Sequence, residues 1–160
     1  MEIRLGSLLT GAREAVGTVV LIDVYRAFTT APVMFLRGAD KIVMVGETKD
    51  ALALKRRGVG DLCIGEIGGE RPDGFDHGNS PFEMARTDLA GKTVIQSTRA
   101  GTVGVEAARK ADRIYAGSLV MAEATAAAIL EDDPSVVSIV AMGWEGRART
   151  DEDEQCAFYL

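Results

Sequence analysis

The sequence has few of the residues that mark a thiol enzyme, a zinc protein or a nucleic-acid-binding protein. Its two cysteines, Cys63 and Cys156, lie far apart and belong to no CxxC pair, so neither a zinc site nor a disulfide framework is indicated. The chain holds a single histidine, His77. Its 18 basic and 24 acidic residues give a net charge of -6, which disfavours attraction to polyanions such as DNA and RNA.

Long apolar runs and a leader segment are also missing. No apolar stretch approaches the roughly 18 residues that a membrane-spanning helix needs. The N-terminus lacks the basic start and apolar core of an export signal, so we expect a cytoplasmic protein with no membrane segment. The 160 residues, 47% of them hydrophobic, fit one globular domain over residues 1–160.

What is present is an alternation of strand-like and helix-like segments. Four β-branched apolar runs predict buried strands at residues 18–24, 41–46, 92–97 and 135–143, with weaker runs at 61–66 and 113–117. Helix-like segments lie at residues 26–38, 48–58, 100–111 and 118–133, although Pro32 interrupts the first. This alternation predicts a layered α/β/α fold with a mainly parallel sheet. Ligands of such folds bind beyond the carboxyl ends of the strands.

The end of the sequence is unusual. RTDEDEQCAFYL begins like a helix with an acidic first turn and stops after one or two turns. We therefore expect the domain to be cut short at its C-terminus.

The first polar cluster follows the strand predicted at 18–24. In DVYRAFTT, Asp23 ends an apolar run and Arg26 comes three residues later, at the edge of the sheet where ligands bind. A structural interpretation also stays open, in which Asp23 is a turn or cap residue and Arg26 is its salt-bridge partner.

A second cluster lies in GFDHGNSPFE. Ser80 as N-cap, a following proline and Glu83 three residues on make a capping box. Asp76 and Asn79 are either Asx-turn residues or functional ones. His77 is a catalytic candidate because the ordinary pKa of histidine lies near neutral pH, but an exposed loop histidine is the simpler interpretation.

A third cluster, QSTRAGTVG, again runs from strand to helix. It combines the hydroxyls of Thr98 and Thr102 with Arg99 and with Gly101, which permits close backbone approach. Free N–H groups at a helix start favour an anion. The stretch therefore predicts a phosphate or sulfonate site, with ordinary helix capping as the alternative for either threonine.

The acidic run at residues 151–154 completes the set. Such runs are usually solvated faces or helix starts. Beside a phosphate-binding loop, however, oxygen ligands drawn from Asp23, Glu66, Asp76 and this run would suit Mg²⁺.

The motifs DVYRAFTT, GE, GFDHGNSP, STRAGT and EDEQCA, in this order, resemble those of the 2-phosphosulfolactate phosphatase family. The resemblance implies an α/β fold and a Mg²⁺-dependent acid phosphatase. It also implies hydrolysis of 2-phospho-3-sulfolactate to 3-sulfolactate and phosphate, a step toward coenzyme M.

Carried over by motif, the resemblance implies roles for particular residues. The catalytic candidates are Asp23, Glu66, Asp76 and Glu152, and the metal candidates are these four and Asp153. The candidates for substrate or phosphate binding are Arg26, Asn79 and Ser80 from these motifs, together with Thr98, Arg99, Gly101 and Thr102 from the strand-to-helix stretch described above. His77 falls at a position where the family motif has no fixed residue, whereas Phe28 and STRAGT differ from the residues that the family commonly has.

The sequence therefore predicts a phosphoric monoester hydrolase for 2-phosphosulfolactate or a similar small phosphorylated acid. A non-catalytic anion-binding or regulatory domain derived from this family is the alternative, and the early end of the chain favours it. A thiol enzyme using Cys63 or Cys156 is a weaker third hypothesis. The sequence leaves open whether the chain forms homo-oligomers.

Overall fold

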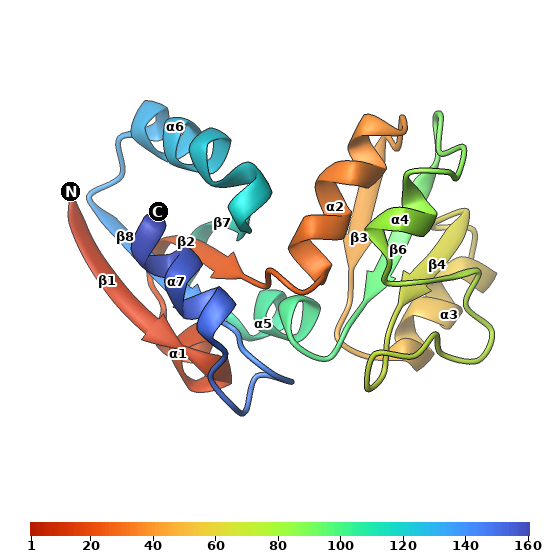
Figure 1. The fold of residues 1–160 in the computed structure, drawn as a ribbon, viewed down its shortest axis with the longest axis horizontal. Helices are drawn as coiled ribbons and strands as arrows, with labels where there is room; N and C mark the ends of the chain where they lie inside the picture. Colours follow the sequence, from red (N-terminus) through yellow and green to blue (C-terminus); the bar gives the residue numbers. More distant parts are fainter.

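The computed structural model describes residues 1–160, whose strands form two parallel sheets (Figure 1). The first sheet contains β1 (Glu2–Ser7), β8 (Val136–Ala141), β2 (Gly17–Ile22) and β7 (Ala111–Gly117), in that order. The second contains β3 (Lys41–Met44), β6 (Thr93–Ser97), β4 (Leu62–Gly65) and β5 (His77–Gly78). All strand pairs in both sheets are parallel.

Helices cover both faces of each sheet. On the first sheet, α1 (Leu8–Glu14) and α5 (Gly101–Ala107) pack on one face, and α6 (Ala122–Asp132) and α7 (Asp151–Tyr159) on the other. On the second sheet, α2 (Ala27–Leu36) and α4 (Pro81–Met84) lie opposite α3 (Thr48–Arg56). A short 3₁₀ helix, η1 (Leu119–Met121), precedes α6. This architecture confirms the predicted layered α/β fold with mainly parallel strands, which are divided between two sheets.

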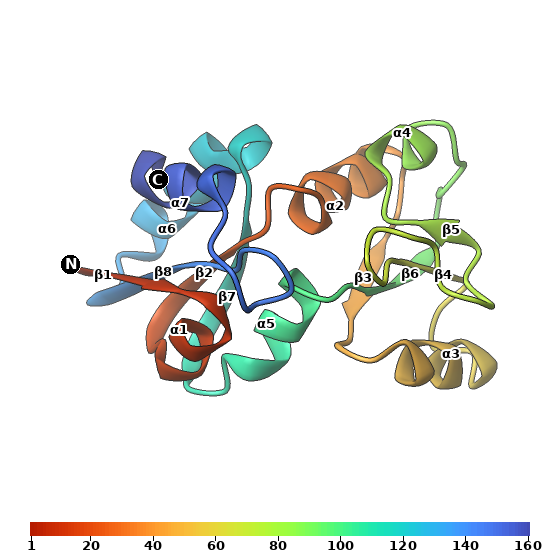
Figure 2. The same ribbon diagram turned by 60° about the horizontal axis from the view of Figure 1, so that its bottom comes forward.

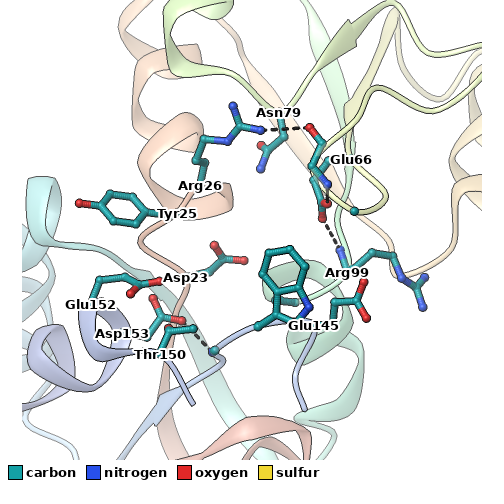
Figure 3. A pocket seen from close by; sticks show the side chains of 15 residues that line it. Asp23, Tyr25, Arg26, Glu66, Asn79, Arg99, Glu145, Thr150, Glu152 and Asp153 are labelled. Carbon is teal, nitrogen blue, oxygen red and sulfur yellow. Dashed lines mark hydrogen bonds between the residues drawn. The ribbon is translucent and has the colours of Figure 1, made fainter. Parts of the chain in front are cut away.

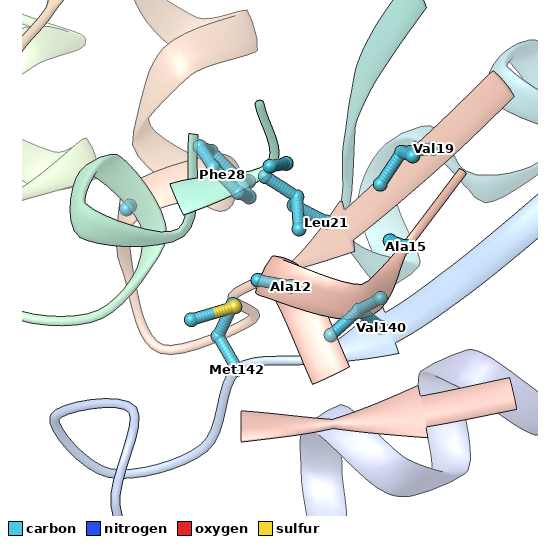
Figure 4. Close-up of a cluster of buried hydrophobic side chains, with 9 residues drawn as sticks. Ala12, Ala15, Val19, Leu21, Phe28, Val140 and Met142 are labelled. Atoms are coloured by element: carbon cyan, nitrogen blue, oxygen red, sulfur yellow. The ribbon is translucent and has the colours of Figure 1, made fainter. Parts of the chain in front are cut away.

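The apolar run in β2 serves two cores at once. Val19 and Leu21 pack toward α1 and α5 together with Phe28, as Figure 4 shows. Val20 and Ile22 point to the other face and pack against α6 and α7. Because successive strand side chains alternate between faces, a strand covered on both sides is apolar throughout.

The chain crosses between the two sheets twice, through α2 after β2 and through α5 after β6 (Figures 1 and 2). Pro32 lies inside α2 and has no N–H to donate to the Phe28 carbonyl four residues earlier. That carbonyl instead accepts a hydrogen bond from the buried Ser118 hydroxyl at 2.8 Å. Ser118 follows β7, so this bond also fastens α2 to the first sheet.

The predicted strands and helices are confirmed, with ends shifted by a few residues, and three elements were missed: β1, α1 and the two-residue β5. β1 is an edge strand whose first residues are mostly exposed, so its sequence shows no continuous apolar run. α1 has only seven residues and contains Gly11. None of the helices combines the length and apolar character needed to cross a membrane. The single-domain organisation stays a prediction.

Candidate active site

The carboxyl ends of β2, β4, β6 and β8 surround one cavity of about 280 Å³ (Figure 3). Seven of the residues predicted from sequence line it: Asp23, Arg26, Glu66, Asn79, Arg99, Glu152 and Asp153. Strand ends from both sheets contribute to the lining, so the cavity lies at the junction between them. This is the edge at which parallel α/β folds bind ligands.

Asp23 follows β2 and is almost fully buried. Its Oδ1 accepts a hydrogen bond from the Ala27 N–H at 3.0 Å, and its Oδ2 accepts one from the Gly101 N–H at 2.8 Å. Burial raises the pKa of Asp23 to about 7, and the negative charges of Asp153 and Glu66 act in the same direction against the two N–H donors. Asp23 therefore joins the starts of α2 and α5 and lacks a cationic partner.

Asp153 on α7 is a second buried carboxylate beside Asp23. It accepts hydrogen bonds from the Val24 N–H at 2.8 Å and the Gly143 N–H at 2.7 Å. Burial raises its pKa, although both N–H groups oppose the shift. Asp153 thereby fastens α7 to the ends of β2 and β8. The side chain of Glu152, the neighbouring residue in the cavity, makes no hydrogen bond or ion pair within the chain.

Glu66 directly follows β4 and accepts hydrogen bonds from two separate segments of the backbone. Its Oε1 accepts from the Arg99 N–H at 2.8 Å and its Oε2 from the Gly69 N–H at 2.8 Å. Gly68 and Gly69 both have positive φ, so the turn that brings Gly69 back to Glu66 depends on glycine. Glu66 therefore shapes the cavity wall as well as lining it.

Two arginines lie along the cavity from the side of the second sheet. Arg26 is the residue before α2, and its Nη2 donates to the Gly69 carbonyl at 3.3 Å. Arg99 follows β6, and its Nη1 donates to the Gly46 carbonyl at 3.4 Å and lies 3.6 Å from Glu47. The salt bridge between Asp23 and Arg26, which belonged to the alternative structural interpretation of this motif, is absent: both Asp23 oxygens accept backbone N–H groups.

Asp76 is not brought to the cavity. Both of its oxygens lie 2.6 Å from Lys55 Nζ, and Oδ2 also accepts from the Cys63 N–H at 2.7 Å. Burial raises the pKa of Asp76, but the Lys55 and Cys63 hydrogen bonds outweigh it, so the pKa is lowered overall. Here Asp76 anchors the loop before Asn79 to β4 and α3. Its assignment as a metal ligand stays a prediction.

Ser80 and His77 also lie outside the cavity lining. The Ser80 hydroxyl accepts from the Glu83 N–H at 3.3 Å, which confirms its N-cap role. Glu83 bonds the Gly78 N–H at 3.2 Å and not the N-cap residue's own N–H, so only half of the capping box forms. His77 is in β5, with Nδ1 3.6 Å from Glu83.

The threonines of STRAGT are turned inward. Thr98 and Thr102 are buried and bond one another's backbone, with the Thr98 N–H donating to Thr102 Oγ1 at 2.8 Å. A Cβ at Gly101 would lie 2.9 Å from Asp23 Oδ2 and from Phe28. Gly101 is thus needed for the approach of α5 to Asp23. An anion-binding role for these three residues stays a prediction.

Sequence reasoning missed several residues that line the cavity: Tyr25, Trp144, Glu145 and Thr150. Tyr25 is 74% exposed and Trp144, the only tryptophan of the chain, is 60% exposed. The available signal for Trp144 was its place in the sequence MGWEG, at the end of the strand predicted at residues 135–143.

The two cysteines are buried and free. Burial raises the pKa of both thiols, that of Cys156 to about 11. Because the thiolate is the reactive form, these environments disfavour thiol chemistry.

Comparison with known proteins adds to this geometry. Residues 7–160 match the family model described as 2-phosphosulpholactate phosphatase. A probable 2-phosphosulfolactate phosphatase from Carboxydothermus hydrogenoformans is 43% identical over 119 residues, which are 74% of this chain and 49% of the relative. The relative of the same name from Thermus thermophilus is 38% identical over 84% of this chain and 56% of its own. The chain spans about half the length of the curated relatives it matches.

Proposed function

The chain belongs to the 2-phosphosulpholactate phosphatase family, and from this premise we propose that it hydrolyses the phosphate ester of 2-phosphosulfolactate or a similar small phosphorylated acid. One observation carries the proposal. The ends of four strands bring carboxylates and arginines from separate family-like motifs around a single cavity. Phosphoryl transfer depends on such positioned charges of both signs.

The arginines and the amide on one side of the cavity suit an anionic substrate. Arg26 and Arg99 line that side, with the Arg99 guanidinium group beside Gly46 and Glu47, and Asn79 adds an amide. Guanidinium groups bind the oxygens of phosphate and carboxylate through paired hydrogen bonds. A substrate that bears phosphate, carboxylate and sulfonate groups needs several such donors.

The acidic side of the cavity suits a divalent cation, and we include Mg²⁺ in the proposal. Five acidic residues and two arginines are among the lining residues. The pKa of Asp23 is raised to about 7 by burial and by the negative charges of Asp153 and Glu66. The chain has no group of three acidic, histidine or cysteine side chains arranged around one point. Mg²⁺ in phosphoryl-transfer sites is usually held by one or two carboxylates, with substrate oxygens and water completing its shell.

Asp23 and Asp153 are the proposed pair of Mg²⁺ ligands. Each carboxylate oxygen already accepts a backbone N–H, which fixes its orientation and leaves a further lone pair. When bound, the ion withdraws electron density from the phosphoryl oxygens. Glu66 and Glu152 are further candidates for this site.

Glu152 is the proposed general base. Because it lines the cavity without an internal hydrogen bond or ion pair, its carboxylate is available to accept a proton from the attacking water. The water oxygen bonds to phosphorus as the bond to the ester oxygen breaks. Arg26 and Arg99 hold the phosphoryl oxygens. The departing ester oxygen takes a proton from solvent and Glu152 returns its proton to solvent, which gives the hydroxy acid and phosphate.

The test is phosphate release by the purified chain from 2-phosphosulfolactate, 2-phospholactate and 3-phosphoglycerate, with Mg²⁺ and with excess EDTA. We expect release that EDTA abolishes. Glu152→Gln should lower kcat by about 100-fold or more. Asp151→Asn is the matched control, because it removes an equal charge from the same helical turn but does not line the cavity, and it should stay within about twofold.

Three outcomes contradict the proposal or part of it. Folded protein that releases no phosphate from any of these esters overturns the catalytic assignment and favours the non-catalytic anion-binding alternative. Equal losses in Glu152→Gln and Asp151→Asn overturn the role of Glu152. Release that persists in EDTA removes Mg²⁺ from the proposal.

A further inference from the structure

A glutamine beneath the cavity has an unusual environment. Gln96 on β6 is fully buried among apolar side chains, and its Oε1 has no hydrogen-bond partner. A buried, unpaired carbonyl oxygen is unfavourable. A methionine of similar size at this position would have no unpaired oxygen. The role of Gln96 therefore depends on its amide nitrogen, which does make hydrogen bonds.

That nitrogen makes two hydrogen bonds. Gln96 Nε2 donates to the Ala27 carbonyl at 3.1 Å and to Asn79 Oδ1 at 3.3 Å. The Ala27 carbonyl is only an acceptor, so it requires the NH₂ group of Gln96 on its side. The second hydrogen of the same NH₂ then requires the oxygen of Asn79, and the network thereby fixes both amide orientations.

The orientation of Asn79 has a direct consequence for the cavity. With its oxygen turned to Gln96, the NH₂ group of Asn79 is the part left for a ligand. It has no hydrogen-bond partner in the chain and is not among the buried unpaired atoms, and Asn79 lines the cavity beside Arg26 and Glu66 (Figure 3). An NH₂ group binds an anionic oxygen and does not ligate a cation.

We infer that Gln96 is a positioning residue that fixes Asn79 as a hydrogen-bond donor to an anionic oxygen of the substrate. The inference rests on the proposed function, because it assumes that the cavity receives a phosphorylated acid. Ala27, which anchors Gln96, is the first residue of α2, so Gln96 positions Asn79 against a fixed point of the backbone.

The test measures binding of inorganic phosphate, so it does not depend on turnover. Affinity is measured by titration calorimetry and by the fluorescence of Trp144, the only tryptophan, which lines the cavity. Asn79→Ala should weaken phosphate binding about 10-fold or more, because it removes a hydrogen bond to a charged group. Gln96→Met, which lets Asn79 rotate, should weaken binding about two- to fivefold.

Gln96→Glu is the polarity reversal. A glutamic acid turns an oxygen toward Asn79, so the Asn79 NH₂ group rotates away from the cavity and its oxygen faces the phosphate. We expect a loss at least as large as that of Asn79→Ala. Ser97→Ala is the matched control: Ser97 is the next residue, is equally buried and has an unpaired hydroxyl, and its loss should leave phosphate affinity unchanged.

The double variant separates positioning from a general structural role. In an Asn79→Ala background, Gln96→Met should have no further effect on phosphate affinity. Circular dichroism and urea unfolding establish that each variant is folded, and if Gln96→Glu does not fold, the cycle with Gln96→Met decides alone. Losses that multiply, or a folded Gln96→Met with unchanged affinity, overturn the inference.

The outcomes also distinguish this inference from the proposed function. Coupled losses in a chain that binds phosphate but hydrolyses no ester would support Gln96 as a positioning residue and overturn the phosphatase activity. A chain that hydrolyses the ester, but in which the losses in phosphate affinity of the Gln96 and Asn79 variants multiply, would support the phosphatase activity and overturn the role of Gln96. Wild-type protein that binds no phosphate by either method overturns the inference.

Discussion

The cavity has two walls that differ in their charge and in the bonds that hold them, and Glu66 is the one lining carboxylate that follows a strand of the second sheet. The acidic wall, formed by Asp23, Glu152 and Asp153 beside the first sheet, has two carboxylates fixed by backbone N–H groups. The donor wall, formed by Arg26, Asn79 and Arg99 toward the second sheet, presents side-chain N–H groups. Its members are held by side-chain hydrogen bonds of 3.3–3.4 Å.

This difference shows how one cavity combines rigidity with adaptability. Backbone N–H donors at strand and helix ends lose no side-chain entropy when they orient a carboxylate, so Asp23 and Asp153 are preorganised charges. Arginine side chains keep more freedom and can adjust to the shape of an anion. We therefore expect the acidic wall to determine cation binding and the donor wall to determine substrate affinity.

The largest expected effect comes from removing a charge from the donor wall. Arg26→Gln should lower kcat/KM about 100-fold, because it removes a charge-assisted donor to the phosphoryl group. Mg²⁺ affinity, measured by calorimetry, should stay within about twofold, because the acidic wall is intact. Arg26→Lys should recover only part of the activity, since lysine lacks the paired donors of a guanidinium group.

Arg71→Gln is the control for this change. Arg71 is exposed and donates to the Asp76 carbonyl outside the cavity, so its loss should leave kcat/KM nearly unchanged. If Arg26→Gln weakened Mg²⁺ and substrate binding equally, the division of the cavity into two walls would be wrong.

The walls also show how far sequence predicts a site. Asp23 and Asp76 both stand in family-like motifs, beside a strand end and a glycine-rich turn. Asp23 reaches the cavity because it directly follows β2, whose carboxyl end lies there. Asp76 pairs with Lys55, from a helix 21 residues earlier, and no local pattern reveals that pairing.

The fold was more predictable than the site because its signals are local. The buried strands β2, β6 and β8 have apolar runs that serve two packed faces. The division of the strands into two sheets depends on where α2 and α5 cross, which periodicity does not encode. Gln96 was missed for a related reason, since its partners Ala27 and Asn79 are 69 and 17 residues away.

An intermediate effect is expected at Asp76, which supports the donor wall from outside. Its pKa is lowered because the bonds to Lys55 and the Cys63 N–H outweigh burial. The ionised form therefore stabilises the fold at pH values above the ordinary aspartate pKa of about 4, and this stabilisation is lost as the pH falls through the lowered pKa. Asp76→Asn should lower the free energy of unfolding by about 1–2 kcal/mol at pH 7.

Urea unfolding at several pH values checks this prediction. The difference between Asp76→Asn and the wild type should shrink as the pH falls through the lowered pKa of Asp76, because the wild-type carboxyl also becomes neutral there. Asp73→Asn, an exposed change in the same loop, should show no such dependence. A tenfold loss of Mg²⁺ affinity in Asp76→Asn would instead support the metal role that its motif implies.

The smallest effect tests whether the donor wall is adjustable. Arg99 lies 3.6 Å from Glu47, a pair that is largely exposed and so contributes at most about 1 kcal/mol. Substrate must compete with Glu47 for this guanidinium group, so Glu47→Gln should lower KM about two- to threefold with kcat unchanged.

Asp50→Asn is the control for this change. Asp50 is an exposed acidic residue in the first turn of the same helix, and its substitution removes an equal charge without touching Arg99. Steady-state kinetics of both variants separate the two explanations: an equal fall in KM would mean that net charge attracts the substrate, whereas a fall in Glu47→Gln alone would mean that Arg99 moves between Glu47 and the bound anion.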